Sequence, residues 1–177
     1  IWLNKSLSTN CDKIFHNALY DVGWLRREGI TLNGKIQDTV IAAPLIDENR
    51  RQYSLNSLGF DYCKEVKDET LLAEAAKSYG IDPKAEMYKL PAKFVGEYAE
   101  QDAVLTLKLW DKLKKLLEIQ KLEPIYELES SLIPLLVEMR WRGVRVDVNK
   151  AEETVAKLKQ QEKDCIKQIK YKYGVDV

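Results

Sequence analysis

The chain lacks several features that would assign it to a common class at once. Its 177 residues contain one histidine and three cysteines, and no two cysteines form a Cys-x-x-Cys pair. A zinc site is therefore not expected, and three ordinary thiols indicate a reducing, intracellular setting. No apolar run reaches membrane-spanning length, and no signal peptide is visible. Lys plus Arg and Asp plus Glu number 28 each, so any contact with nucleic acid must be local.

The length bounds the domain organisation. A chain of 177 residues suits one domain, or one domain and part of another. The sequence opens on Ile1 rather than methionine, which indicates a segment of a longer protein. Neither an internal repeat nor a low-complexity segment is present, so repeat architectures are not expected.

Residues 97–110 are predicted to form an amphipathic helix. Its apolar residues recur at helical spacing and should pack on a core: Ala99, Ala103, Leu107 and Trp110, with Val104 and Leu105 widening the stripe. Tyr98 and Asp102 lie four residues apart. This spacing places a phenol and a carboxylate on one helical face, where both side chains can contact the same small ligand. An ordinary helix with a surface carboxylate beside a partly buried tyrosine has the same pattern.

A second polar cluster follows a predicted strand at Lys13–Asn17. The apolar pair Ile14-Phe15 leads into a turn at His16 and Asn17, and a helix that should end near Glu28-Gly29 follows. Further on, Asp38 precedes an apolar run and is a natural helix N-cap. Capping, or support of a nearby site, is favoured for Asp38 over direct metal ligation.

Two of these segments resemble motifs of a known family. Asn17, Tyr20 and Asp21 resemble the second exonuclease motif of the proofreading domains of family A DNA polymerases. Tyr98 and Asp102, within Glu-Tyr-Ala-Glu-Gln-Asp-Ala, resemble the third motif in its tyrosine-containing subtype. The two motifs occur in the expected order, some eighty residues apart, and together they are more specific than either one alone.

The resemblance implies an α/β fold of the ribonuclease H type and a site with two divalent metal ions, Mg²⁺ or Mn²⁺. Such a pair clamps the attacking and the leaving oxygen of a phosphodiester and lowers the pKa of a bound water. By resemblance, Asp102 would bind the metal that activates the water, and Tyr98 would orient that water. Asp21 would serve the second metal, and Asn17 would position the nucleotide or the motif itself.

The sequence departs from the family in its acidic residues. The family's site uses four carboxylates, two of them from an Asp-x-Glu or similar pair on an early strand upstream of the second motif. No Asp-x-Glu occurs in this chain, and only twenty residues precede Asp21. With Asp21 and Asp102 alone, two metals should bind poorly. We therefore expect this chain by itself to be a very weak exonuclease or none.

The last third of the chain carries a third resemblance. A helical stripe includes Leu128, Leu132 and Met139, with Pro134 expected to bend the helix and Gly143 to end it. Glu-Met-Arg-Trp-Arg-Gly-Val-Arg-Val-Asp, residues 138–147, resembles the start of the family A polymerase domain. Residues 150–173, capped by Asp147 or Asn149, resemble the first thumb helix, with a coiled coil as the rival interpretation.

These patterns predict part of a family A DNA polymerase that takes part in DNA replication. Residues 1–121 would be a 3′-5′ proofreading exonuclease domain that lacks its first strands, and residues 122–177 the mainly helical start of the polymerase domain. The expected partners are the DNA primer 3′ end, single-stranded DNA and the remainder of the polymerase chain, with no membrane. The expected location is the cytoplasm of a bacterium or phage-infected cell, or an organelle. The alternatives are a decayed exonuclease-like scaffold and a stand-alone 3′-5′ exonuclease.

Overall fold

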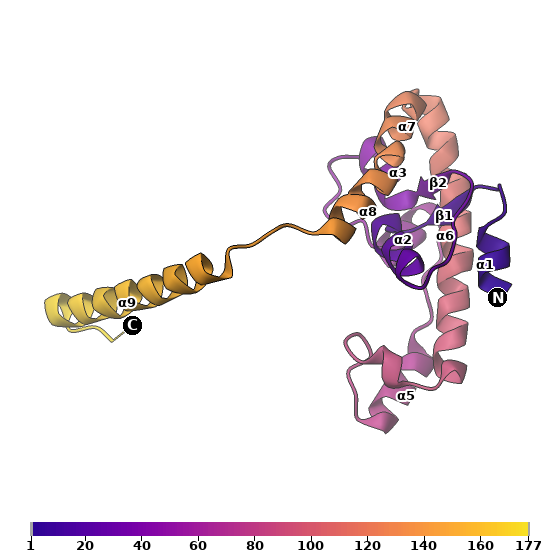
Figure 1. Ribbon diagram of the computed structural model, residues 1–177. Helices are drawn as coiled ribbons and strands as arrows, with labels where there is room; N and C mark the ends of the chain where they lie inside the picture. The colour runs from indigo at the N-terminus through magenta and orange to yellow at the C-terminus, as the bar shows by residue number, and fades with distance from the viewer. Residues whose placement is uncertain (1, 177) are drawn as a thin grey trace. The chain divides into compact units, whose positions relative to one another are not determined.

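The computed structural model describes residues 2–176 and divides into two compact units, Ile1–Trp141 and Arg142–Val177. The first unit is mixed α/β and mostly helical (Figure 1). Its elements in chain order are α1 (Trp2–Leu7), β1 (Lys13–Phe15), α2 (Ala18–Arg27), β2 (Ile36–Asp38), α3 (Thr39–Ile46), α4 (Leu55–Leu58), the π-helical turn η1 (Gly59–Cys63), α5 (Thr70–Tyr79), the 3-10 turn η2 (Met87–Lys89), α6 (Ala92–Gln120), α7 (Glu123–Ser131) and α8 (Ile133–Arg142).

The described residues form a single two-stranded sheet. β1 pairs in parallel with β2, with Lys13 opposite Ile36 and Phe15 opposite Asp38, and α2 is the crossover between them. The predicted strand at 13–17 is confirmed but ends two residues earlier, because the backbone of Asn17 turns to φ 78°. Both strands therefore end at the same edge of the sheet, where β1 gives way to α2 and β2 to α3.

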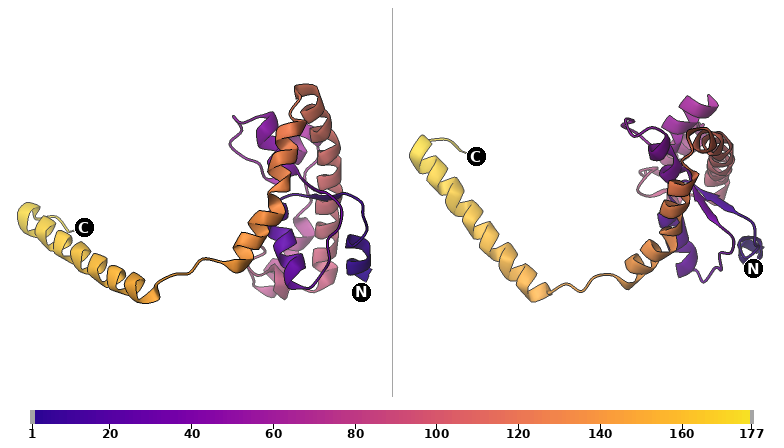
Figure 2. Two further views of the ribbon diagram at one scale, coloured as in Figure 1. Left: turned by 45° about the horizontal axis from the view of Figure 1, so that its top comes forward. Right: turned by 90° about the horizontal axis from the view of Figure 1, so that it is seen from above.

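Both faces of this short sheet are covered. On one face, Ile14 packs against the main hydrophobic core, whose best-buried large side chains are Leu58, Leu109, Leu113 and Leu117. On the other face, Phe15 and Ile36 pack against a smaller cluster whose buried members are Ala18, Ile133 and Val137, from α2 and α8. The views in Figure 2 show α6 as one long helix beside this assembly.

The buried face of α6 differs from the predicted one. Ala99 and Ala103 are exposed, and Leu107 and Val104 are about half exposed at 51% and 53%. The residues that are buried along the helix are Leu105, Thr106, Leu109, Trp110, Leu113 and Leu117. Apolar residues occupy more than one face of this helix, so periodicity alone could not select the face that meets α3 and η1. Burial of Leu105 and Trp110 agrees with the prediction.

A satellite core lies at the N-terminal end of α6. Leu72, Ala75 and Ala76 of α5 are buried together with Leu90, and Phe94, Val95 and Tyr98 of α6 pack against them. Figure 1 shows α5 beside this end of the long helix, away from the two strands. Tyr98 and Asp102 therefore lie between the satellite core and the main core.

Several helix boundaries follow from local side-chain and backbone chemistry. Asp38 caps α3 by accepting from the backbone N–H of Val40, and Ser54 caps α4 by accepting from that of Ser57. Gly29 and Gly143 follow their helices with φ of 67° and 70°, a conformation that glycine adopts without strain. Around Pro134 the expected bend is a break, with α7 ending at Ser131 and α8 starting at Ile133.

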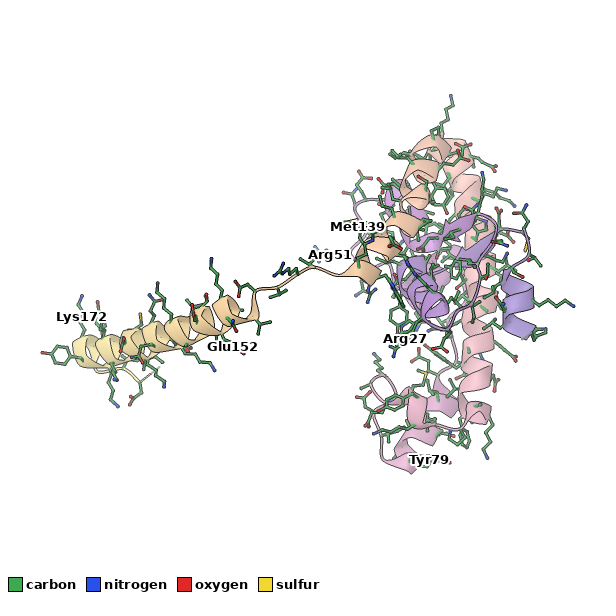
Figure 3. The ribbon with its side chains drawn as sticks, viewed as in Figure 1. Arg27, Arg51, Tyr79, Met139, Glu152 and Lys172 are labelled. Carbon is green, nitrogen blue, oxygen red and sulfur yellow. The ribbon has the colours of Figure 1, made fainter. Side chains whose placement is uncertain are left out.

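The second unit contains α9 (Val148–Tyr173), capped by Asp147, whose side chain accepts from the backbone N–H of Lys150. No residue of this helix is buried, and Figure 3 shows its side chains, such as Glu152 and Lys172, spreading on all sides. Within residues 2–176, no helix combines the length and the apolar character needed to cross a membrane.

Candidate active site

The first part of the site is the turn that follows β1. Asn17 adopts a left-handed conformation, which asparagine tolerates better than most residues because its side chain is short and polar. Beside it, His16 Nδ1 lies 2.8 Å from Thr39 Oγ1, and that hydroxyl donates to the carbonyl of Phe15 at 3.1 Å. Which of Nδ1 and Oγ1 donates in the first of these contacts depends on the tautomer of the His16 ring. These bonds join the ends of the two strands.

Asp38, the last residue of β2, connects the end of β1 with the starts of α2 and α3. Its side chain is buried, and its carboxylate accepts three backbone N–H groups, from Asn17 at 3.0 Å, Ala18 at 2.7 Å and Val40 at 2.8 Å. Its own backbone N–H donates to the hydroxyl of Tyr126 at 2.8 Å. The capping role predicted for Asp38 is confirmed, and the same carboxylate also fixes the start of α2.

Asp21 lies one turn into α2 and is half-buried. Burial raises the pKa of the Asp21 carboxyl, and the nearby charge of Asp38 raises it further. Both causes mean that a carboxylate at this position is destabilised by its surroundings. A bound cation would relieve that cost, which is the electrostatic property expected of a metal ligand.

Tyr98 and Asp102 lie one turn apart on α6, as predicted, and Lys67 joins them. Lys67 Nζ donates to the hydroxyl of Tyr98 at 2.8 Å and lies 3.0 Å from Asp102 Oδ1. The ammonium also lies 4.4 Å from the centroid of the Tyr98 ring. The Lys67 side chain is only 10% exposed, and that of Asp102 is 33% exposed. The pair is therefore a partly desolvated ion pair rather than a mobile surface contact.

His16 connects the two halves of the site electrostatically. Burial lowers the pKa of the His16 imidazole, while the negative charges of Asp38 and Asp102 act in the opposite direction. Asp102 on α6 is thus close enough to the strand ends to influence His16, and Asp38 influences both His16 and Asp21. Asn17 and Asp21 thus lie at and just beyond the carboxyl end of β1, and Tyr98 and Asp102 lie together on α6 beside Lys67.

The residues that the structure describes do not complete a metal centre. Asp102 Oδ1 is a buried oxygen that receives no well-aligned hydrogen bond within the described chain, and such an oxygen suits a cation. However, residues 2–176 contain no group of three His, Cys, Asp or Glu side chains that could hold a metal ion. Two carboxylates, one of them paired with Lys67, do not fit a two-metal site by themselves.

Two contacts of the site had no signal in the sequence. Lys67 lies in an irregular segment between η1 and α5, where neither periodicity nor a motif distinguishes it from the other lysines. Tyr126 lies 88 residues beyond Asp38, to which its hydroxyl is hydrogen-bonded. Only the tertiary fold brings such distant residues together.

Comparison with known proteins gives a family match that covers both motifs of the candidate site. The 3′-5′ exonuclease domain of family A DNA polymerases matches residues 2–118. The chain is 37% identical over 161 residues to a DNA-directed DNA polymerase of Pseudomonas phage M6, covering 90% of this chain and 24% of that protein. It is 31% identical to DNA polymerase DpoZ of Acinetobacter phage SH-Ab 15497, covering 99% of this chain and 29% of that protein.

The chain is also similar to a bacterial DNA polymerase. The chain is 28% identical over 164 residues to DNA polymerase I of Chloroflexus aurantiacus, covering 92% of this chain and 17% of that protein. The chain therefore spans less than a third of the length of these relatives. Because the family match includes both the Asn17–Asp21 turn and the Tyr98–Asp102 helix, the chain belongs to the 3′-5′ exonuclease family of the family A DNA polymerases.

Proposed function

We propose that this chain is the proofreading region of a DNA polymerase and acts on the 3′ end of a DNA primer. The reaction would be hydrolysis of the terminal phosphodiester, in a domain of the ribonuclease H type. The observation that carries the proposal is the family match over residues 2–118, which spans Asp21 beyond the end of β1 and the pair Tyr98 and Asp102 on α6.

Each residue has a proposed role. Asp102 and Asp21 would be ligands of two divalent metal ions, Mg²⁺ or Mn²⁺, together with acidic ligands from outside this chain. The metals would stabilise the charge that develops on the attacking and leaving oxygens. Tyr98, with its hydroxyl beside the Asp102 carboxylate, would orient the attacking water. Asn17 is exposed at the turn and would contact the terminal nucleotide.

The extent of the domains is also part of the proposal. Residues 1–121 would form the exonuclease domain and residues 122–177 the beginning of the polymerase domain, with α9 as the first thumb helix. The match of the Acinetobacter phage polymerase over 99% of the chain supports continuity between the two parts. The same match favours a polymerase segment over a stand-alone exonuclease.

One observation favours a second candidate, an exonuclease-like domain that supports the polymerase without catalysis. The ammonium of Lys67 neutralises Asp102, and the described residues gather no third metal-binding side chain around it. A decayed site would have the same appearance. The two candidates differ in what happens when further acidic ligands are supplied.

The test is digestion of a 5′-labelled single-stranded oligonucleotide with Mg²⁺ or Mn²⁺. We expect this chain alone to shorten the oligonucleotide very slowly or not at all, and a longer chain of the same polymerase to shorten it from the 3′ end. In the longer chain, Asp102→Ala should abolish shortening, and Tyr98→Phe should slow it by about 10²-fold. Asp111→Ala, an exposed carboxylate on the same helix, is the matched control and should leave the rate unchanged.

Two results would contradict the proposal in different ways. Rapid digestion by this chain alone, lost in Asp102→Ala, would show that its own carboxylates suffice. A longer chain that polymerises DNA but leaves the oligonucleotide intact would identify a decayed scaffold.

A further inference from the structure

The segment that leads into β1 holds a buried charge that the proposed reaction does not use. Lys13, the first residue of β1, is only 8% exposed and carries an ammonium. Its Nζ atom lies 3.3 Å from the sulfur of Cys11, which is an exposed residue. We propose that Cys11 and Lys13 form a thiolate–ammonium pair, and that Cys11 is the thiol of this chain that peroxides oxidise.

The other contacts of the Lys13 ammonium leave its charge unbalanced. An ammonium has three N–H donors, and three backbone carbonyls lie around Nζ: those of Thr9 and Cys11 at 2.7 Å each, and that of Asn33 at 2.9 Å. These carbonyls satisfy the donors but have no net charge. In the part of the chain that the structure describes, no Asp or Glu pairs with this ammonium, and the neighbouring carboxylate of Asp12 accepts from Gln37 Nε2 at 2.9 Å instead.

The need for a counter-charge points to Cys11. A buried positive charge without an opposite charge beside it is costly. Among the residues that contact the ammonium within 2–176, Thr9 and Asn33 contribute neutral groups, and Cys11 is the one whose side chain can lose a proton to become an anion. Ionisation of Cys11 therefore supplies the charge that Lys13 lacks, and the same pairing stabilises the thiolate, which is the reactive form of cysteine.

The surroundings of the sulfur favour the same form. Thr9 Oγ1 lies 3.1 Å from Cys11 Sγ, and the hydrogen bonds of Thr9 and Lys13 to the sulfur lower the pKa of the Cys11 thiol. The other two cysteines have different surroundings. Cys165 is exposed on α9, and burial raises the pKa of the Cys63 thiol. The chain thus contains two internal standards for the reactivity of Cys11.

Oxidation by hydrogen peroxide needs no further group from the chain. The thiolate attacks one peroxide oxygen, the S–O bond forms as the O–O bond breaks, and the hydroxide that leaves takes a proton from solvent to become water. Sulfur is oxidised by two electrons and the peroxide is reduced by two, so Cys11 becomes a sulfenic acid. Because Cys11 is exposed, both the peroxide and the solvent proton have access to it.

The first test compares the three cysteines of the unchanged chain, without metal ions or nucleic acid. Mass spectrometry would follow alkylation by iodoacetamide over a range of pH. At pH 7 we expect Cys11 to react at least about fivefold faster than Cys165, and Cys63 to react most slowly. After hydrogen peroxide, dimedone, which traps sulfenic acids, should label Cys11 first. In concentrated urea, where the pair is lost, the alkylation rates of Cys11 and Cys165 should become equal.

The second test changes the partners of the sulfur. Lys13→Met keeps the apolar stem and removes the charge, so it should slow alkylation of Cys11 at pH 7 to about the rate of Cys165. Because Lys13 is buried, Thr9→Val in the exposed loop is the second variant, and it should also slow Cys11. Lys5→Met removes an exposed lysine of α1 and is the matched control, with no expected change. Circular dichroism checks that each variant is folded.

Two results would overturn the proposal. One is a folded chain in which Cys11 reacts no faster than Cys165. The other is a Cys11 rate that is the same in Lys13→Met, in Thr9→Val and in the unchanged chain. Neither result affects the proposed function, because the pair of Cys11 and Lys13 is separate from Tyr98 and Asp102 and its assay contains no DNA.

Discussion

At the scale of single residues, the three aspartates Asp38, Asp102 and Asp21 differ in how their charge is compensated. Asp38 is stabilised by three backbone donors, and Asp102 by Lys67. Within residues 2–176, Asp21 has neither kind of partner, and burial raises the pKa of its carboxyl. Such a residue costs stability at neutral pH, which is common where a site is built for a ligand.

The raised pKa of Asp21 predicts how the free energy of unfolding depends on pH. Its pKa in the folded chain lies above the ordinary value of 3.8, so the folded state holds this proton more tightly than the unfolded state. The resulting stabilisation is present below 3.8 and is lost as the pH rises through the folded-state pKa. Asp21→Asn removes the charge, so it should raise the free energy of unfolding at pH 7, and this gain should shrink as the pH falls toward 3.8.

Urea denaturation at several pH values measures this difference. Asp111→Asn, on the exposed side of α6, is the control and should not change the free energy of unfolding in a pH-dependent way. An Asp21→Asn chain that is less stable than the unchanged chain at pH 7 would show that the carboxylate makes a favourable contact instead.

Residue chemistry also decides how much of the site could be predicted. The cap at Asp38 follows from local sequence, because a short acidic side chain before an apolar run accepts the first N–H groups of a helix. The pair Tyr98 and Asp102 follows from helical spacing. Lys67 could not be predicted, since its contact with Asp102 spans 35 residues of chain and depends on how α5 and α6 pack.

At the scale of elements, α6 holds the first unit together. Its C-terminal half supplies Leu109, Leu113 and Leu117 to the main core, and its N-terminal half supplies Phe94 and Val95 to the satellite core. The existence of this helix was predictable from its periodicity, but its buried face was not. Val104 and Leu107 are apolar and yet half exposed, so the face is set by the elements that pack on it.

The buried face of α6 gives a prediction that compares two leucines of the same helix. Leu109 is fully buried and Leu107 is 51% exposed, two residues away on the same helix. Leu109→Ala should lower the free energy of unfolding by about 2–5 kcal/mol, because it leaves a cavity in the main core. Leu107→Ala should change it by less than about 0.5 kcal/mol. Denaturation in urea compares the two variants, and similar losses would mean that α6 is rotated from the face described.

At the scale of the whole molecule, the two units differ in how they are stabilised. The unit Ile1–Trp141 contains the buried clusters, whereas α9 has no buried residue. A helix of this kind gains little from packing and depends on its cap and on local pairs such as Gln160 with Asp164. The sequence offered Asp147 or Asn149 as its cap, and the structure has Asp147, so the helix begins at Val148.

Removal of residues 142–177 should therefore leave the first unit nearly as stable as before, within about 0.5 kcal/mol. The four tryptophans are Trp2, Trp24, Trp110 and Trp141, so their fluorescence during denaturation reports the first unit alone. A chain that ends at Ser131 is the control. It lacks Ile133 and Val137, which are buried beside the sheet, and it should lose about 2 kcal/mol or more. A large loss on removing residues 142–177 alone would contradict the prediction.

The satellite core has a consequence for how the site loses its structure. Tyr98 takes its packing from a cluster with four buried residues, whereas the helix beyond Asp102 is anchored in the much larger main core. Small clusters open at lower free energy than large ones, in sub-global unfolding that leaves the rest of the protein intact. The amide protons of α5 should thus exchange with deuterium earlier than those around Leu109. In that partly open state the Tyr98 ring loses the cluster on which it packs, while Asp102 stays on the part of α6 that leads into the main core.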